Sequence, residues 1–162
     1  MAYKNVEDLV IENARIIFRN FTGREAKYND PGVRNFCVII EDAGVAQNLA
    51  DDGWNVRILP PRGEDEEGKH YIQVAVGFER FPPRIFMVTQ KRKTLLNEGN
   101  VESLDYAEII NVDLTIRARV WDDNGRRRVK AYLKEMYATI EEDRFADKYS
   151  HLDNPDEDES FC

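Results

Sequence analysis

The residues best suited to chemistry lie between Asn111 and Lys134, where cationic and aromatic side chains alternate with apolar ones. Every second residue of 112–120 is apolar, and the same alternation resumes after the Asn124-Gly125 dipeptide. Because side chains alternate across a strand, the remaining residues of both segments share the opposite face. The pattern therefore predicts one surface with two basic residues at its tip, Arg126 and Arg127, and these residues across it: Arg117, Arg119, Trp121, Arg128, Lys130, Tyr132 and Lys134.

Such a surface is suited to binding single-stranded nucleic acid. Arg and Lys side chains track phosphates and gain affinity from counterion release. Exposed aromatic rings stack on unpaired bases, which contributes about 1–3 kcal/mol per base and is largely indifferent to sequence. The alternative is a solvated hairpin in which Trp121 and Tyr132 form a cross-strand pair. Two aromatic residues in register with several cations favour the binding interpretation.

Three further groups of residues are weaker candidates for the same surface. The basic triplet Lys91, Arg92 and Lys93 follows a strand-like segment and is expected to extend the surface, although such triplets are also common in solvated loops. Arg80 and Arg84 bracket an aromatic-proline segment. Tyr28 and Trp54 are candidates for base stacking, although a Trp that opens a strand more commonly packs in the core.

Strand-like patterns position these residues. The hairpin is the clearest, because Asn-Gly is a strong turn signal. Its returning strand is expected from about Arg126 to Ile140, with a phase slip near Glu135 that predicts a β-bulge. The other expected strands cover residues 14–19, 34–40, 54–59, 70–78 and 84–89.

Helical segments are few. Residues 43–52 are expected to form a helix that ends at Gly53, with three apolar residues facing inward: Val45, Ala46 and Leu49. The stretch 94–107 is expected as a helical connection. Six to eight short strands with one or two short helices predict a mainly β fold, namely a closed or partly open, OB-like barrel with extra strands. A β-sandwich is the alternative.

The net charge of −8 is concentrated at one end of the chain. From Glu141 onward there are nine acidic and two basic residues, a net of −7, which leaves −1 for the first 140 residues. Without the acidic loop 64–67 that body carries +3, so it is free to present a positive surface. We expect a binding domain over 1–140, a short helix or linker over 141–152 and a disordered acidic tail over 153–162.

The tail combines charge with one large aromatic residue. Its acids and its ring are Asp156, Glu157, Asp158, Glu159 and Phe161. A flexible acidic stretch with an aromatic anchor can dock into a basic, apolar-floored pocket of a partner. It can also lie in the cationic groove of its own body and compete with nucleic acid. A tail that only confers solubility is the alternative.

The β-rich body, the cationic-aromatic hairpin and the acidic, Phe-containing tail together resemble phage and bacterial single-stranded DNA-binding proteins of the OB-fold type. Segments 11–18 (IENARIIF) and 129–134 (VKAYLK) also look like phage-encoded proteins of this kind. The resemblance implies an OB-like five-stranded barrel with extra strands, and coating of single-stranded DNA during replication or recombination. It further implies that the tail recruits replication proteins such as a polymerase, helicase or primase, in the bacterial host cytoplasm.

The sequence contains few signals for catalysis or for a bound cofactor. There is no Gly-rich phosphate loop, and two Cys with two His do not provide a zinc site of the usual spacing. We therefore expect no enzymatic activity, no metal and no cofactor. The carboxylates weighed for a metal-dependent nuclease are scattered, and such acids more commonly lie on the surface: Asp105, Glu108 and Asp113.

The competing hypothesis is an acidic protein-interaction module, such as a DNA mimic or inhibitor that occupies a partner's basic groove. The pI of about 4.9 and the acidic loop 64–67 support it. Against it, the best-patterned strands carry arginines. Cys37 lies in an apolar run and Cys162 ends the polar tail, so we expect reduced thiols and a cytoplasmic protein without a membrane segment. The sequence leaves open the choice between DNA and RNA, and a homo-oligomer is compatible with it.

Overall fold

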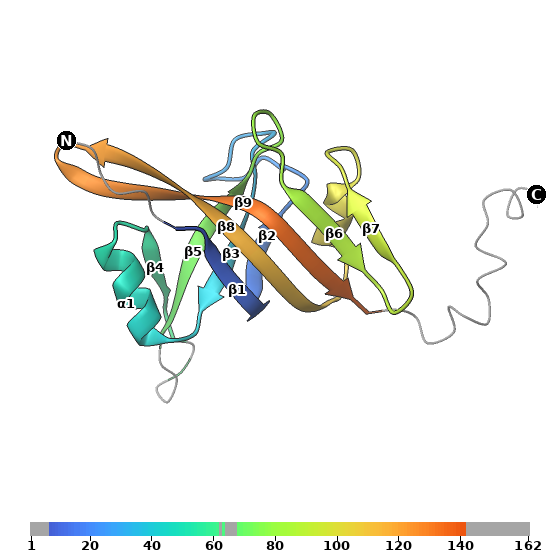
Figure 1. Cartoon of the computed structure of the whole chain (residues 1–162), viewed down its shortest axis with the longest axis horizontal. Coiled ribbons are helices and arrows are strands. Elements are labelled where there is room, and N and C mark those ends of the chain that lie inside the picture. Colours follow the sequence, from blue (N-terminus) through green and yellow to red (C-terminus); the bar gives the residue numbers. More distant parts are fainter. Residues whose placement is uncertain (1–6, 62, 64–67, 142–162) are drawn as a thin grey trace, which may run out of the picture.

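The computed structural model describes residues 7–61, 63 and 68–141, and within them it is mainly β (Figure 1). The expected linker beyond Glu141, the acidic tail and the acidic loop 64–67 lie outside the described residues. The elements are β1 (Leu9–Ala14), β2 (Ile16–Asn20), β3 (Arg34–Ile40), α1 (Ala43–Asp51), β4 (Val56–Leu59), β5 (Lys69–Val76), β6 (Arg84–Val88), β7 (Lys93–Leu96), the short 3-10 helix η1 (Val101–Asp105), β8 (Ile109–Asp123) and β9 (Arg126–Ile140).

The long hairpin of β8 and β9 forms as its pattern predicts. Asn124 and Gly125 both have positive φ, 53° and 86°, as a two-residue hairpin turn of type I′ requires. The two strands pair from Asp123 opposite Arg126 back to Ile109 opposite Ile140. The expected bounds of the returning strand are confirmed.

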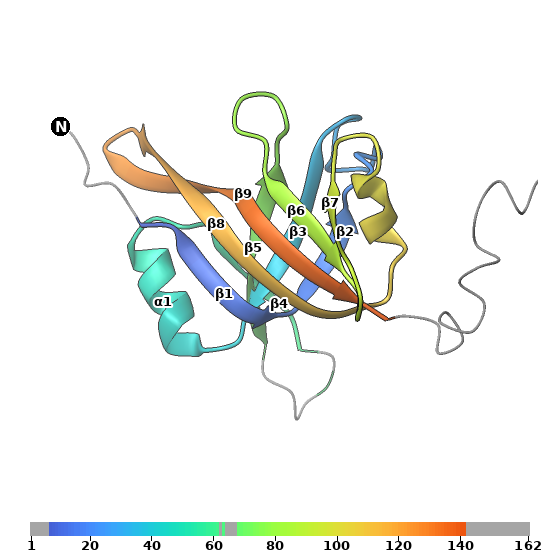
Figure 2. The ribbon, with the colours of Figure 1, turned by 45° about the vertical axis from the view of Figure 1, so that its right-hand side comes forward.

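Strand β9 is the centre of the sheet. It pairs antiparallel with β8, and parallel with β5 and β6. The sheet order is β1-β8-β9-β5-β3-β2, with β4 added beside β5 and β7 beside β6. The described strands thus form one sheet, not the two of a sandwich. Arg15 alone separates β1 from β2, so the two ends of this order belong to one continuous ribbon, as Figure 2 shows.

The predicted bulge in β9 is confirmed and has a consequence for the surface. Thr115 pairs with Glu135 whereas Ile116 pairs with Leu133, so Lys134 has no opposite residue. One extra residue shifts the alternation of a strand by one position. Tyr132, before the bulge, and Tyr137, beyond it, consequently lie on the same face of the sheet.

Helix α1 closes one side of the molecule. The Asp42 side chain accepts hydrogen bonds from the Gly44 and Val45 amides, as an N-cap does, and the helix ends at Asp51 before Gly53. Ala46 and Leu49 are buried as expected. The inward placement of Val45 was wrong, because a helix this short covers the core with a single narrow stripe and leaves Val45 42% exposed.

The expectation of a helical connection over 94–107 is only half correct. Its first part is the strand β7, which pairs with β6, and only its second part, η1, is helical. Three apolar residues of this stretch enter the core: Leu96, Val101 and Leu104. Short apolar runs fit either period, so the pattern alone did not separate strand from helix.

The core lies between the curved sheet, α1 and η1. Phe21 and Phe36 are fully buried and stack at 5.3 Å between ring centroids. Burial raises the pKa of the Cys37 thiol to about 11, although the charge of Arg57 opposes that shift. Within the described part of the chain, neither helix is long and apolar enough to cross a lipid bilayer.

Candidate nucleic-acid interface

The hairpin brings six of the predicted binding residues onto one face. The register pairs Arg117 with Tyr132, Arg119 with Lys130, and Trp121 with Arg128. Their neighbours in sequence point into the core, where Ile116, Val129 and Leu133 are buried. We call this surface the hairpin face: Arg117, Arg119, Trp121, Arg128, Lys130 and Tyr132.

Tyr132 is the contact centre of the hairpin face. The Arg117 guanidinium lies 5.2 Å from its ring centroid and the Lys130 ammonium 5.3 Å. Burial raises the pKa of the Tyr132 hydroxyl, but hydrogen bonding from Arg119 and the charges of Lys130 and Arg119 outweigh it and leave the pKa below its ordinary value. The ring and the cations thus form one cluster, with several donors beside an aromatic surface.

Phe81 joins this cluster from the loop between β5 and β6, and it was not among the predicted stacking residues. Its ring is 66% exposed, and the Arg117 guanidinium lies 4.8 Å from its centroid. Arg117 therefore lies against two rings, Phe81 and Tyr132. The only signal in the sequence was the position of Phe81 between Arg80 and Arg84, next to two prolines.

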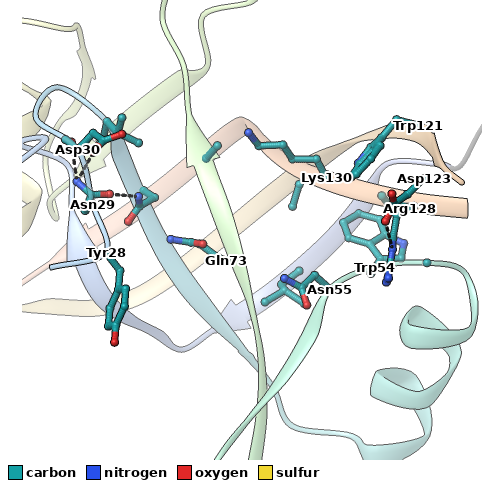
Figure 3. Close-up of a pocket in the computed structure, with 17 residues that line it drawn as sticks. Tyr28, Asn29, Asp30, Trp54, Asn55, Gln73, Trp121, Asp123, Arg128 and Lys130 are labelled. Carbon is teal, nitrogen blue, oxygen red and sulfur yellow. Dashed lines mark hydrogen bonds and ion pairs between the residues drawn. The ribbon is translucent and has the colours of Figure 1, made fainter. Parts of the chain in front are cut away.

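Two hollows lie beside the hairpin face. The first, of about 630 Å³, lies between the hairpin, the start of β4 and the loop before β3. We call it the tryptophan hollow, because both tryptophans line it (Figure 3). Tyr28, on its far rim, is 89% exposed, whereas Trp54 is only 4% exposed. Figure 3 also shows the polar side chains that surround it: Asn29, Asp30, Asn55, Gln73, Asp123, Arg128 and Lys130.

The second hollow, of about 660 Å³, lies between the hairpin and the loop 77–81. We call it the arginine hollow, because Arg34, Arg80, Arg117 and Arg119 line it. Both hollows share three lining residues, Val33, Ala75 and Lys130. They are therefore parts of one depression, the hairpin groove, which crosses the junction of β5 and β9.

The charge of the hairpin groove is positive. Six cations line it, against four acids: Asp30, Glu79, Glu98 and Asp123. Arg34 pairs with Glu98 at 3.3 Å and Arg128 with Asp123 at 3.5 Å. Among the residues that the structure describes, the other four cations have no carboxylate within ion-pair distance: Arg80, Arg117, Arg119 and Lys130.

Beyond the bulge, the same face of β9 carries a second aromatic cluster. Phe86 and Tyr137 stack at 4.9 Å between centroids. The Lys93 ammonium lies 4.7 Å from the Phe86 centroid, and the Arg84 guanidinium lies 5.3 Å from it. Of the predicted basic triplet, Lys93 thus joins this surface.

The other predicted residues lie apart from the groove. Lys91 and Arg92 are in the turn between β6 and β7, near the far end of β9. Lys134 pairs with Asp8 at 2.7 Å. Arg126 is at the hairpin tip, and Arg127 belongs to the opposite face because it alternates with Arg128. The predicted tail residues lie outside the described part of the chain.

The carboxylates weighed for a metal site do not converge. Asp105 is a structural group that accepts hydrogen bonds from the Phe21 and Thr22 amides at 2.7 and 2.9 Å. Asp113 accepts one from the Asn13 amide at 2.9 Å. Among the described residues, no three acids, histidines or cysteines are grouped as metal ligands.

A β body with an open groove of cations and exposed rings has the architecture of a single-strand-binding protein. Residues 1–160 match the family described as "Putative phage ssDNA-binding domain", and the chain belongs to that family. A comparison with curated proteins found no match.

Solved structures of the single-stranded DNA-binding protein from bacteriophage Enc34 share the fold. Its complex with ssDNA is 12% identical, with 85% of this chain and 89% of that chain covered and a TM-score of 0.53. A C-terminal truncation is 12% identical, with 84% and 87% covered and a TM-score of 0.51. A third structure of that protein is 13% identical, with 88% and 89% covered and a TM-score of 0.51.

Proposed function

We propose that this protein is a non-enzymatic DNA-coating protein that binds single-stranded DNA along the hairpin groove with little sequence preference. The observation that carries the proposal is the joining of both hollows across the hairpin face, with exposed rings at both ends and four cations that form no ion pair with any described residue. We also propose that the sheet forms an OB-like barrel. The continuous β1–β2 ribbon supports this proposal, because β1 and β2 are the two ends of the strand order.

The arrangement suits single strands because the groove offers rings as well as charges. Trp121 and Phe81 are 47% and 66% exposed and lie toward opposite ends of the groove, so each can stack on an unpaired base. A duplex keeps its bases stacked and cannot use these rings. The excess of cations over acids in the groove supports this function over that of a DNA mimic.

The salt dependence of binding tests the proposal. Arg117→Ala, Arg119→Ala and Lys130→Ala are each expected to reduce the slope of log Kd against log salt by about 0.7, the contribution of one phosphate contact on a single strand. Fluorescence anisotropy with an oligo-dT and a matched duplex, at four salt concentrations, measures the slope. Arg57→Ala, outside the groove, is the control. Equal affinity for duplex, or no binding of either at low salt, would refute the proposal.

We further propose that the acidic tail competes with DNA for the groove. Residues 153–162 carry five acids and no base. Deleting them is expected to tighten DNA binding at low salt, with a gain that shrinks as salt rises, because screening reaches about 10 Å at 0.1 M. A tail of equal length with Asn and Gln for its acids should match the deletion. Unchanged affinity of both variants at low salt would contradict competition.

A role of the tail in replication or recombination is a separate proposal. An aromatic residue in an acidic tail supports docking on a polymerase, helicase or primase. Phe161→Ala should then abolish capture of that partner by the full-length protein while it leaves the charge of the tail, and its competition with DNA, unchanged. Retained capture by this variant would leave the tail without a docking role.

A further inference from the structure

The loop between β2 and β3 is closed at its base by hydrogen bonds. The side-chain oxygen of Asn20 accepts hydrogen bonds from the Gly23 and Arg24 amides at 3.0 and 2.8 Å. The Gly32 amide donates to the Gly23 carbonyl at 2.8 Å and so joins the two arms of the loop. The shape of this loop is therefore set before any ligand binds.

Asn29 holds the interior of the loop together. Its Nδ2 donates to three backbone carbonyls, those of Arg24, Asp30 and Val33, at 2.8, 3.1 and 3.0 Å. Its Oδ1 accepts a hydrogen bond from Asn35 Nδ2 at 2.7 Å, which ties the loop to β3. One primary amide has two donors and one acceptor oxygen, and all of them are used here.

The loop presents a tight turn at its tip. The backbones of Ala26 and Asn29 exchange two hydrogen bonds, at 2.8 and 3.1 Å, so Lys27 and Tyr28 are the two central residues of a β-turn. The Lys27 ammonium lies 5.3 Å from the Tyr28 ring centroid. Figure 3 shows Tyr28 beside Asn29, and Tyr28 and Trp121 at opposite ends of the tryptophan hollow.

Stability does not explain why the loop holds this ring. Tyr28 is 89% exposed, so its ring removes little apolar area from water. Ordering the turn costs conformational entropy. Lys27 is exposed as well, and no carboxylate among the described residues lies within ion-pair distance of it. An ordered turn with a free ring and a free cation at the rim of a hollow is suited to binding.

We propose that the turn 26–29 is a pre-ordered arm of the hairpin groove. Tyr28 stacks on an unpaired base of the bound strand, and Lys27 contacts a neighbouring phosphate. Asn29 is a positioning residue, which acts on the strand only through Tyr28. Order that exists before binding raises affinity, because less entropy is lost in the complex. The inference rests on the proposed function and extends the groove to the loop before β3.

The first test concerns the ring and the cation. Tyr28→Ala is expected to weaken oligo-dT binding by about 5- to 150-fold, as the loss of one stacked base does. It should leave the thermal midpoint unchanged, because the ring is exposed. On a fully abasic oligonucleotide the penalty of Tyr28→Ala should vanish. Lys27→Ala should reduce the slope of log Kd against log salt by about 0.7 on both oligonucleotides. Tyr106→Ala, which removes another exposed ring, is the matched control.

The second test concerns Asn29. Asn29→Asp keeps the shape of the side chain but turns an oxygen toward the three carbonyls that Nδ2 contacts. Asn55→Asp is the control for the added charge, because Asn55 lines the same hollow. Asn29→Asp is expected to weaken oligo-dT binding by about 2- to 12-fold more than Asn55→Asp, the cost of ordering one side chain on binding. In the Tyr28→Ala background this excess should vanish, because Asn29 then has no ring to position.

The outcomes separate the arm from the groove. An excess that persists in the Tyr28→Ala background would overturn the positioning role of Asn29. A Tyr28→Ala penalty that persists on the abasic oligonucleotide would overturn stacking. If Arg117→Ala weakens binding and Tyr28→Ala does not, the arm is wrong while the proposed function stands. If neither substitution affects binding, the groove itself is wrong.

Discussion

Trp121→Ala is expected to weaken binding of single-stranded oligonucleotides by about 1–3 kcal/mol, or about 5- to 150-fold, through the loss of one stacked base. Trp121 is suited to this role because it is half-exposed beside Arg128 on the hairpin face. Isothermal titration of oligo-dT measures the loss, and Tyr106→Ala, which removes an exposed ring that lines neither hollow, is the control. If saturating oligonucleotide leaves Trp121 fluorescence unchanged while anisotropy reports binding, Trp121 does not stack.

Tyr132→Ala is expected to cause a loss of the same size, since it removes a ring that contacts two groove cations. Tyr132→Phe keeps the ring and should retain most of the affinity. The comparison separates stacking from the hydroxyl, whose lowered pKa reflects Arg119 and Lys130. Equal losses for both substitutions would assign the effect to the hydroxyl.

The second large effect is expected at Gly53, where α1 meets the hairpin. Its φ is +102°, and an added Cβ would lie 2.6 Å from the Arg127 carbonyl oxygen. The strained backbone alone is expected to lower the free energy of unfolding of Gly53→Ala by about 1–3 kcal/mol. Relief of the overlap with the Arg127 carbonyl oxygen adds a further cost. Because relief must move Arg127 or Trp54, DNA affinity should fall as well.

Urea unfolding measures the stability of the Gly53→Ala variant. Gly77→Ala is the stability control, because its Cβ would have no neighbour within 4 Å. It should change the free energy of unfolding by less than about 0.5 kcal/mol. A Gly53→Ala variant as stable as the wild type would mean that the hairpin and α1 are not in tight contact.

The sequence was most informative where local patterns decide the structure. The period of two, the Asn-Gly turn and the phase slip near Glu135 were sufficient to predict both strands of the hairpin and six residues of its face. These signals arise between residues close in the chain. Lys134 and Arg127 were misplaced, because the bulge removes Lys134 from that face and Arg127 alternates to the opposite one. The face of Val45 was mispredicted, because which side of a short helix is covered depends on the strands around it.

The groove could not be predicted because distant segments build it. Phe81 reaches Arg117 only because β6 and β5 run parallel to β9, and no local signal encodes that pairing. The contribution of Arg34 and Val33 likewise depends on β3 lying beside β5. Conversely, Lys91 and Arg92 were expected to extend the surface, but they lie in the turn between β6 and β7. A basic triplet does not indicate where its turn lies relative to the hairpin.

The pairing of β1 with β8 also bears on how the protein is made. Leu9 lies opposite Ile116, so β1 leaves the ribosome more than 100 residues before its partner in β8. At about 5–20 residues per second, that interval is about 5–20 s of synthesis. A topology dominated by such distant pairings also folds slowly, in about milliseconds to seconds. A nascent chain therefore cannot assemble the hairpin groove until β9 has emerged, so any function of that groove begins only after β9 has been translated.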